Sequence, residues 1–318
     1  MLKYFYGFVL VTAIGIMYEK YRMKYYPDDE LNKIGLIKEF LLNDEDLGKP
    51  ILWIHTTHNV NARNWQSFYS RSTDKLNQPY IISCVETMIK HCGKSFNICL
   101  ISDDSFKKIL PNWKINLDGL ADPVKNHVRQ LALMKTLHSY GGMLIPNSTI
   151  VMKDLKSIYN KGLMDKTCFS VECNNKTSTA DFKQLMPTTK IIGCKRLSPC
   201  MNELLVFLEQ KISSDYTDEW SFLGETSKFI YKLYNENKLE LISGKTFGIV
   251  DKNCNLVIID NLMGNKFIDY DSSQLYAIYI PAKEILSRTQ YQWFARLSQQ
   301  QLRNCDNMVA KYLLVAQG

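Results

Sequence analysis

The stretch "VRQLALMKTLHSYGGMLIPNSTIV", residues 128–151, decides the fold. Apolar residues cover most faces of a helix over 124–140, which predicts a central helix that is buried on most sides. The helix meets Gly141-Gly142, and a glycine readily adopts the backbone conformation that ends a helix. Strands are predicted at 143–145 and 149–152, on either side of Pro146. This order predicts an α/β domain.

The segments upstream predict a parallel unit. An apolar strand is expected at 51–56, a helix that opens with Pro79 at 79–92, and a second buried strand at 96–102. Strand, helix and strand in this order form a βαβ unit, which favours a mainly parallel sheet. A ligand crevice is expected at the carboxyl ends of its strands.

The second half predicts further strands and helices. Its pattern favours strands at 168–172 and 190–193, helices at 199–213 and 220–236, β segments at 246–250, 256–260 and 275–280, and a closing helical stretch at 283–316.

The composition excludes several classes of protein. With 46% hydrophobic and 22% charged residues among 318, the chain is neither disordered nor of low complexity. Its net charge of +7 is dispersed, which fits an anionic membrane or a phosphorylated ligand and argues against nucleic acid as a partner. Nine scattered cysteines without a Cys-x-x-Cys pair favour reduced, mostly buried thiols.

The amino terminus predicts a membrane anchor. Residues 4–18 are uncharged and flanked by basic residues, and as a helix they span about 22 Å. A cleaved signal peptide and a buried helix remain the alternatives. The expected organisation is an anchor at 1–24, an acidic spacer at 25–49 and a domain at 50–318, with halves of about 50–160 and 161–318. The basic residues lie mainly after the apolar run, which favours a cytosolic body.

Three segments carry a resemblance to a known family: "KPILWIHTT" (49–57), "CVETMIKHCGKSFNICLISDD" (84–104) and "VRQLALMKTLHSYGGMLIPNSTIVMKDL" (128–155). Over about 50–160 the chain resembles glycosyltransferases of the type-A fold, in the group that contains capsular-polysaccharide-synthesis proteins and Asp-x-Asp sugar transferases. The resemblance implies a mixed, mainly parallel sheet flanked by helices, with a β and helical extension at the carboxyl terminus. Residues 63–113 and 277–298 also look like a poorly characterised set of such proteins from large DNA viruses.

The family's acidic residues are missing here. In the family, Ser-Asp-x-x-Arg precedes the double glycine and Asp-x-Asp or Asp-Ala-Thr follows it. Aligning the glycines puts these residues in the corresponding positions: Arg129, Gln130, Leu133, Pro146, Asn147 and Ser148. Neutral Asn and Ser oxygens cannot alone hold the Mg²⁺ or Mn²⁺ that offsets a departing diphosphate. No metal site is therefore expected, unless Asp103 and Asp104 replace the lost motif.

Other candidate residues each have a plain structural alternative. Asp103 and Asp104 fit a solvated turn that caps a following helix. Thr56 and Thr57 follow the first strand, where the family holds the nucleotide base, and equally fit a polar loop.

The start of the central helix is a candidate anion site. Lys125, His127 and Arg129 lie there, where helix amides favour an anion, so a diphosphate could bind without metal. The alternative is a basic cluster with a buried acidic partner.

Weaker candidates complete the set. Glu225, in an apolar context, could serve as a base, although an acid near a helix N-terminus is commoner.

His55 and His58 have a zinc-like spacing without a third ligand nearby. The aromatic set Tyr291, Trp293, Phe294 and Leu297 predicts packing of the carboxyl-terminal helix, with a sugar platform as the alternative. Of two Asn-x-Thr/Ser sequons, at Asn147 and Asn175, the second is expected to be the more exposed, with no glycan on a cytosolic body.

Two function classes follow, with a third behind them. The first is a membrane-anchored, glycosyltransferase-like protein that has lost catalysis and serves as a structural or scaffolding component, plausibly of a large DNA virus particle, with virion or capsid proteins as partners. The second is an active, metal-independent transferase that uses a nucleotide-sugar. The third is a carbohydrate-binding module on the same fold.

Overall fold

The computed structural model describes residues 49–57, 78–110, 113–180, 183–214 and 218–318. The predicted anchor, all but the last residue of the spacer, and His58 lie outside these ranges. Across the ranges described, no helix has both the length and the apolar character that crossing a membrane requires.

A six-stranded sheet in the order β2-β1-β3-β6-β5-β7 forms the centre of the domain. Its strands are β1 (Ile51–His55), β2 (Asn97–Ile101), β3 (Gly142–Pro146), β5 (Cys168–Asn174), β6 (Leu185–Cys194) and β7 (Glu240–Ile242). β1 runs parallel to β2 and β3, and β5 runs parallel to β7, while β6 is antiparallel to both of its neighbours. The predicted mixed, mainly parallel sheet is confirmed.

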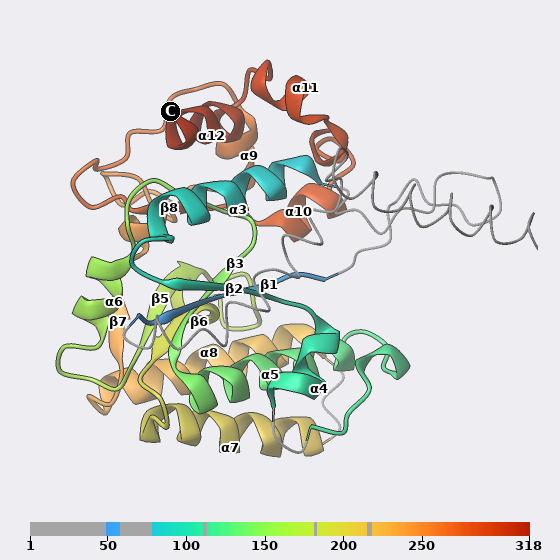
Figure 1. Cartoon of the computed structure of the whole chain (residues 1–318), viewed down its shortest axis with the longest axis vertical. Helices are drawn as coiled ribbons and strands as arrows, with labels where there is room; N and C mark the ends of the chain where they lie inside the picture. The colour runs from blue at the N-terminus through green and yellow to red at the C-terminus, as the bar shows by residue number, and fades with distance from the viewer. Residues whose placement is uncertain (1–48, 58–77, 111–112, 181–182, 215–217) are drawn as a thin grey trace, which may run out of the picture. The chain divides into compact units, whose positions relative to one another are not determined.

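Helices cover both faces of this sheet (Figure 1). On one side lie α3 (Pro79–Cys92), α9 (Ile259–Met263), α10 (Ala282–Ser287), α11 (Gln299–Arg303) and α12 (Met308–Gln317), together with the two-stranded sheet of β4 (Thr149–Val151) and β8 (Ala277–Tyr279). On the other lie α4 (Phe106–Ile109), α5 (Val124–Tyr140), α7 (Pro199–Ser213) and α8 (Glu219–Asn235). α6 (Lys156–Gly162) packs against β5 and β7.

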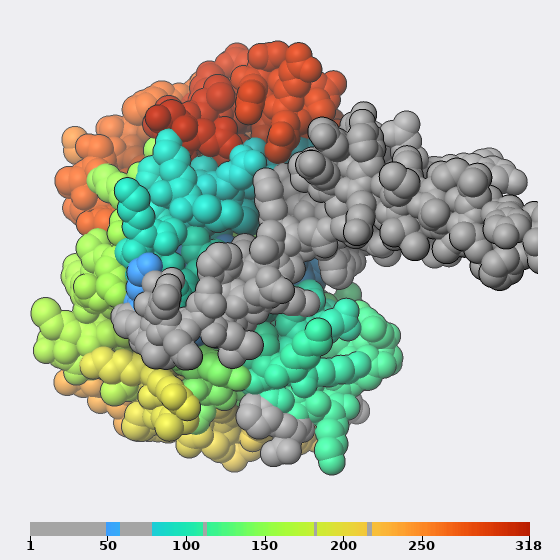
Figure 2. Space-filling model, viewed as in Figure 1, coloured from blue at the N-terminus to red at the C-terminus, as the bar shows by residue number. Residues whose placement is uncertain are grey.

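The carboxyl-terminal elements pack against α3, which belongs to the first half of the domain. Tyr80 and Cys84 on α3 share one buried cluster with Ile278 on β8 and Leu313 on α12. In Figure 2 the red carboxyl-terminal segment lies directly against the cyan atoms of α3. The carboxyl-terminal segment and α3 therefore share one hydrophobic core.

The double glycine joins α5 to β3 in a way that only glycine allows. Gly141 and Gly142 have φ angles of 72° and 101°, and a Cβ on Gly142 would collide with the carbonyl oxygen of Ile51 on the neighbouring strand. The Trp53 indole donates a 2.9 Å hydrogen bond to the Gly141 carbonyl. These contacts fix the amino end of β3 relative to that of β1.

Two of the predicted β segments are wrong. Residues 244–247 form a short 3₁₀ helix, capped by the Ser243 hydroxyl, and the left-handed Gly248 ends it. At 256–260, Leu256 makes only an isolated bridge to Val250, and Ile259 begins α9. Both segments are apolar because they pack into the core, and apolar character alone does not separate a strand from a short buried helix.

The predicted helical stretch at 283–316 is also wrong, because it is interrupted three times. The backbone becomes extended at Arg288, at Leu297 before Ser298 caps α11, and at Asn307 before α12. The aromatic residues of this stretch therefore do not share one helix. Phe294 is fully buried, whereas the Trp293 side chain is 47% exposed.

Candidate functional site

A cavity of about 610 Å³ opens at the carboxyl ends of β1, β3 and β5, where the fold was expected to hold a ligand. α5, α8 and the segment from β8 to α10 supply its other walls. The volume lies in the range of pockets that enclose a ligand of nucleotide size.

One wall holds a closed ionic network at the start of α5. The Arg129 guanidinium donates to both carboxylate oxygens of Asp103, at 2.8 Å from Nε and 2.7 Å from one terminal nitrogen. His55 Nε2 lies 2.9 Å from the same carboxylate, and Arg129 also donates to the Asn126 side-chain oxygen at 2.6 Å. The charge of Arg129 is thus balanced within the protein.

The network keeps Asp103 ionised. Burial alone would raise the pKa of this carboxyl, but the hydrogen bonds from Arg129 and His55 outweigh burial and hold its pKa well below the usual range. Since the carboxylate is an acceptor only, His55 Nε2 carries the proton that they share. The neighbouring Asp104 is exposed and points to no such partner set.

Pro146, Asn147 and Ser148, where the sequence resemblance led us to look for an acidic motif, do not fit a divalent metal. Pro146 and Asn147 line the cavity, but the hydroxyl of Ser148 is buried and donates a 2.7 Å hydrogen bond to the Ile280 carbonyl. Both oxygens of Asp103 already accept hydrogen bonds. Within the described ranges, no three His, Cys, Asp or Glu side chains are grouped as metal ligands would be. We therefore derive no chemistry through a metal here.

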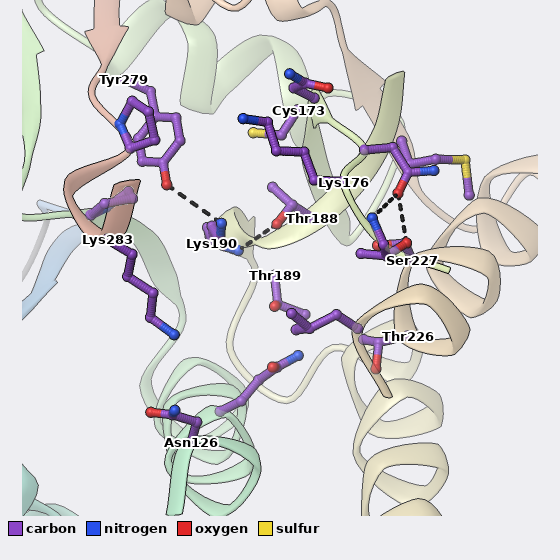
Figure 3. Close-up of a pocket in the computed structure, with 18 of the residues that line it drawn as sticks. Asn126, Cys173, Lys176, Thr188, Thr189, Lys190, Thr226, Ser227, Tyr279 and Lys283 are labelled. Atoms are coloured by element: carbon purple, nitrogen blue, oxygen red, sulfur yellow. Dashed lines mark hydrogen bonds between the residues drawn. The ribbon is translucent and has the colours of Figure 1, made fainter. Parts of the chain in front are cut away.

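The opposite wall carries a lysine without a carboxylate partner. Lys190, on β6, reaches the cavity beside Tyr279 of β8, and its Nζ lies 3.4 Å from the Tyr279 hydroxyl (Figure 3). Lys190 is exposed to solvent at the cavity wall. Among the described residues that line the cavity, Lys190 is the one cation with no carboxylate within ion-pair distance.

The protonation state of Lys190 follows from its neighbours. Its interaction with Tyr279 raises the pKa of the ammonium group and outweighs burial, which would lower it. Lys190 is therefore a charged ammonium at neutral pH, rather than the neutral amine that a nucleophile requires.

Two further lysines line the cavity as members of ion pairs. Lys176, after β5, lies 2.7 Å from Glu284 of α10. Lys283, the residue before Glu284, lies 3.2 Å from Glu219 at the start of α8. Arg129, Lys176 and Lys283 are each balanced by a carboxylate, so Lys190 leaves the cavity walls with one cation in excess, which favours an anion.

The structure separates the three residues of the predicted anion site. Lys125 lies 3.8 Å from Asp118 and does not line the cavity. His127 is 2% exposed and stacks on Phe222 with the ring centres 3.8 Å apart. His127 and Arg129 both line the cavity, and Asp103 is the acidic partner that the alternative interpretation required for Arg129.

Some of the other residues predicted from the sequence line the cavity, and others do not. Thr57, Gln130 and Leu133 line the cavity, whereas Thr56 is buried. Glu225 faces α7, where it pairs with Lys211 at 3.1 Å.

The prediction that Asn175 is more exposed than Asn147 was wrong. Asn175 is 8% exposed, because its side chain bonds to Thr177, Thr179 and the Lys183 carbonyl, while Asn147 lines the cavity. Seven of the nine cysteine side chains are buried, as the composition indicates.

Sequence reasoning missed Lys190, Lys283 and Trp220. None of them lies in a family motif. Lys190 did leave a signal, because it is the single charged residue of the strand "LMPTTKIIGC". A lysine inside a buried strand is uncommon unless it reaches a partner or a cavity.

Comparison with known proteins gives only distant structural likeness. No family model matches the chain, and no curated protein matches it in sequence. Among solved structures, the chain is similar to the PaToxG glycosyltransferase, with 12% identity, a TM-score of 0.35, and coverage of 59% of this chain and 69% of that one. It is also similar to 4-diphosphocytidyl-2C-methyl-D-erythritol synthase from Anaerococcus prevotii DSM 20548, with 10% identity, a TM-score of 0.32, and coverage of 66% and 93%. At these values the likeness assigns neither a family nor an activity.

Proposed function

We propose that this chain is a glycosyltransferase-like protein whose cavity binds a nucleoside diphosphate-sugar, with lysine side chains in place of a divalent metal. The observation that carries the proposal is Lys190, an ammonium group that lines the cavity and has no carboxylate within ion-pair distance among the described residues.

An ammonium group that lines a cavity and is not neutralised by a carboxylate attracts an anionic ligand. The Tyr279 hydroxyl is neutral at physiological pH and offers Lys190 a dipole only. A phosphate oxygen would supply both the missing charge and a charge-assisted hydrogen bond. Lys176 and Lys283 line the same cavity and place two further ammonium groups in it, each paired with a carboxylate.

Three features support a sugar nucleotide over a simple phosphate ester. The cavity is large enough for a nucleotide, and it lies at the strand ends where open α/β sheets bind such ligands. Its walls also carry many neutral hydrogen-bonding groups, among them Asn126, Thr188 and Ser227. The resemblance of residues 50–160 to sugar transferases points to the same ligand class.

Sugar transfer is a second candidate, supported by Lys190 itself. An ammonium group placed at a departing diphosphate stabilises its charge as a metal ion does. The cavity carboxylates favour the non-catalytic alternative, since Glu219 and Glu284 are both held in ion pairs and neither stands free as a base. Incubation with uridine diphosphate sugars separates the two, because transfer or hydrolysis releases uridine diphosphate and simple binding returns the sugar nucleotide intact.

The proposal includes the predicted placement on a membrane. Its support is the apolar run at 4–18 and the basic residues that follow it, and these favour a body on the cytosolic side. A role in a large DNA virus particle has the sequence resemblance of 63–113 and 277–298 as its support.

Thermal unfolding of the full chain in detergent tests ligand binding. Uridine and guanosine diphosphates and their sugars are added in EDTA, and at least one should raise the Tm by about 2 °C or more. Adding Mn²⁺ should raise it no further. Lys190→Met should abolish the shift, whereas Lys195→Met, an exposed lysine just after β6, should retain it. A shift that needs Mn²⁺, or one that survives Lys190→Met, contradicts the proposal.

A further inference from the structure

Trp220 presents an aromatic face at the cavity that the protein itself does not cover. It lies in the first turn of α8 and lines the cavity, and its side chain is 59% exposed. Leu223, one turn further along α8, and Ile258, just before α9, line the same cavity. A large apolar surface beside polar groups in a cavity is typical of a ligand contact rather than of core packing.

The backbone under Trp220 is held in place from two sides. Asp218 caps α8 by accepting a 3.1 Å hydrogen bond from the Trp220 amide. The Ser178 hydroxyl donates to the Trp220 carbonyl at 3.4 Å. A Cβ on Gly224 would come within 2.7 Å of the Ser178 hydroxyl oxygen, so this glycine allows α8 to approach the 174–180 segment closely.

The facing segment is equally fixed. Asn175 donates to the Thr179 hydroxyl at 3.1 Å and to the Lys183 carbonyl at 2.8 Å, and it accepts from the Thr177 hydroxyl at 2.7 Å. The two sides of this wall are therefore set before a ligand arrives, which lowers the entropic cost of binding.

The order of strands places this wall beyond the proposed phosphate position. Thr57 follows β1, β3 comes next in the sheet, and Lys190 lies on β6, against which α8 packs. A nucleotide whose nucleoside lies near Thr57 and whose phosphates meet Lys190 would extend toward α8. In Figure 3 Thr226 and Ser227 of α8 lie across the cavity from Asn126.

We infer that Trp220 is the platform of a saccharide subsite. The apolar face of a sugar ring stacks on an indole, and its hydroxyls need neutral hydrogen-bonding groups such as that of Ser227. The inference rests on the proposed function for its ligand class, but its binding surface is separate from Lys190. The sugar is either that of the bound nucleotide or a free acceptor saccharide, and both have this chemistry.

Saturation-transfer NMR of the full chain in detergent tests the subsite without nucleotide. The probes are methyl β-glucoside, methyl β-galactoside, methyl α-mannoside and N-acetylglucosamine. At least one should show transfer to its ring protons. Trp220→Ala should lose at least tenfold in affinity for it, and Trp220→Phe should recover most of that loss because it restores an aromatic face. Trp293→Ala is the matched control, since Trp293 is similarly exposed but does not line the cavity.

Adding nucleotides distinguishes the two possible sources of the saccharide. If the subsite takes an acceptor, the free sugar still binds beside uridine diphosphate-glucose. If it takes the sugar of the nucleotide, uridine diphosphate leaves the free sugar bound and uridine diphosphate-glucose displaces it. Absence of transfer to every probe, or equal transfer in Trp220→Ala, overturns the inference. If nucleotide binding is lost in Lys190→Met but kept in Trp220→Ala, the proposed nucleotide site stands even when the saccharide subsite is overturned.

Discussion

Arg129 and Lys190 face the same cavity from opposite walls, and they differ in what balances their charge. Arg129 is bound by Asp103 and Asn126, so its wall is complete without a ligand. Among the described residues, Lys190 has no carboxylate within ion-pair distance, and its Nζ lies 3.4 Å from the Tyr279 hydroxyl. Arg129 stands in a family motif position and Lys190 in none, which shows that motif position alone does not identify the charge available to a ligand.

The largest expected effect is a loss of folding stability when the ion pair between Arg129 and Asp103 is removed. Asp103→Asn removes the charge that balances Arg129 and His55, and we expect it to lower the free energy of unfolding by about 2 kcal/mol. Asp104→Asn, at the adjacent exposed position, should change it by less than about 0.5 kcal/mol. Urea unfolding at pH 7 measures both. Equal effects would mean that the network does not stabilise the fold.

The pH dependence of that difference follows from the pKa of Asp103. Because its folded-state pKa lies below the usual range, its stabilisation is fully present above about pH 4 and is lost as the pH falls through the folded value. The gap in unfolding free energy between wild type and Asp103→Asn should be constant from pH 7 to pH 5 and should narrow below about pH 4. A gap that already narrows between pH 7 and pH 5 would assign the effect to another group.

The smallest expected effect concerns the partner of Lys190. Tyr279→Phe removes the hydroxyl near the ammonium group but keeps the ring that packs beneath it. We expect the affinity for a nucleoside diphosphate to change by about threefold, against at least tenfold for Lys190→Met. Calorimetric titration in EDTA measures both variants. Loss of binding in Tyr279→Phe equal to that in Lys190→Met would make the hydroxyl, rather than the charge, the main ligand contact.

The first half of the fold could be predicted because its signals are local. The strands at 51–55 and 97–101, the helix at 124–140 and the double glycine each follow from periodicity or from a glycine whose conformation no other residue adopts easily. The secondary structure of the last third was mispredicted because its apolar segments pack as 3₁₀ turns and short helices. Their ends depend on caps such as Ser243 and Ser298 that serve equally well in loops.

The site could be predicted only in its location. The strand ends indicated where a ligand would bind, and Arg129, Thr57 and Asn147 do line that cavity. Lys190 and Trp220 come from β6 and α8, far along the chain, and no spacing rule connects them to β1 and β3. Which cation lacks a partner depends on three-dimensional contacts, and these separate Lys190 from Arg129.

The most direct test of the account is a crystal structure of the protein with uridine or guanosine diphosphate, whichever raises the Tm, grown in EDTA. The account predicts a phosphate oxygen within hydrogen-bond distance of Lys190 Nζ, with the ion pair between Arg129 and Asp103 intact and without a bound metal ion. A diphosphate held instead at Arg129 and the start of α5, with Lys190 left in solvent, would contradict it.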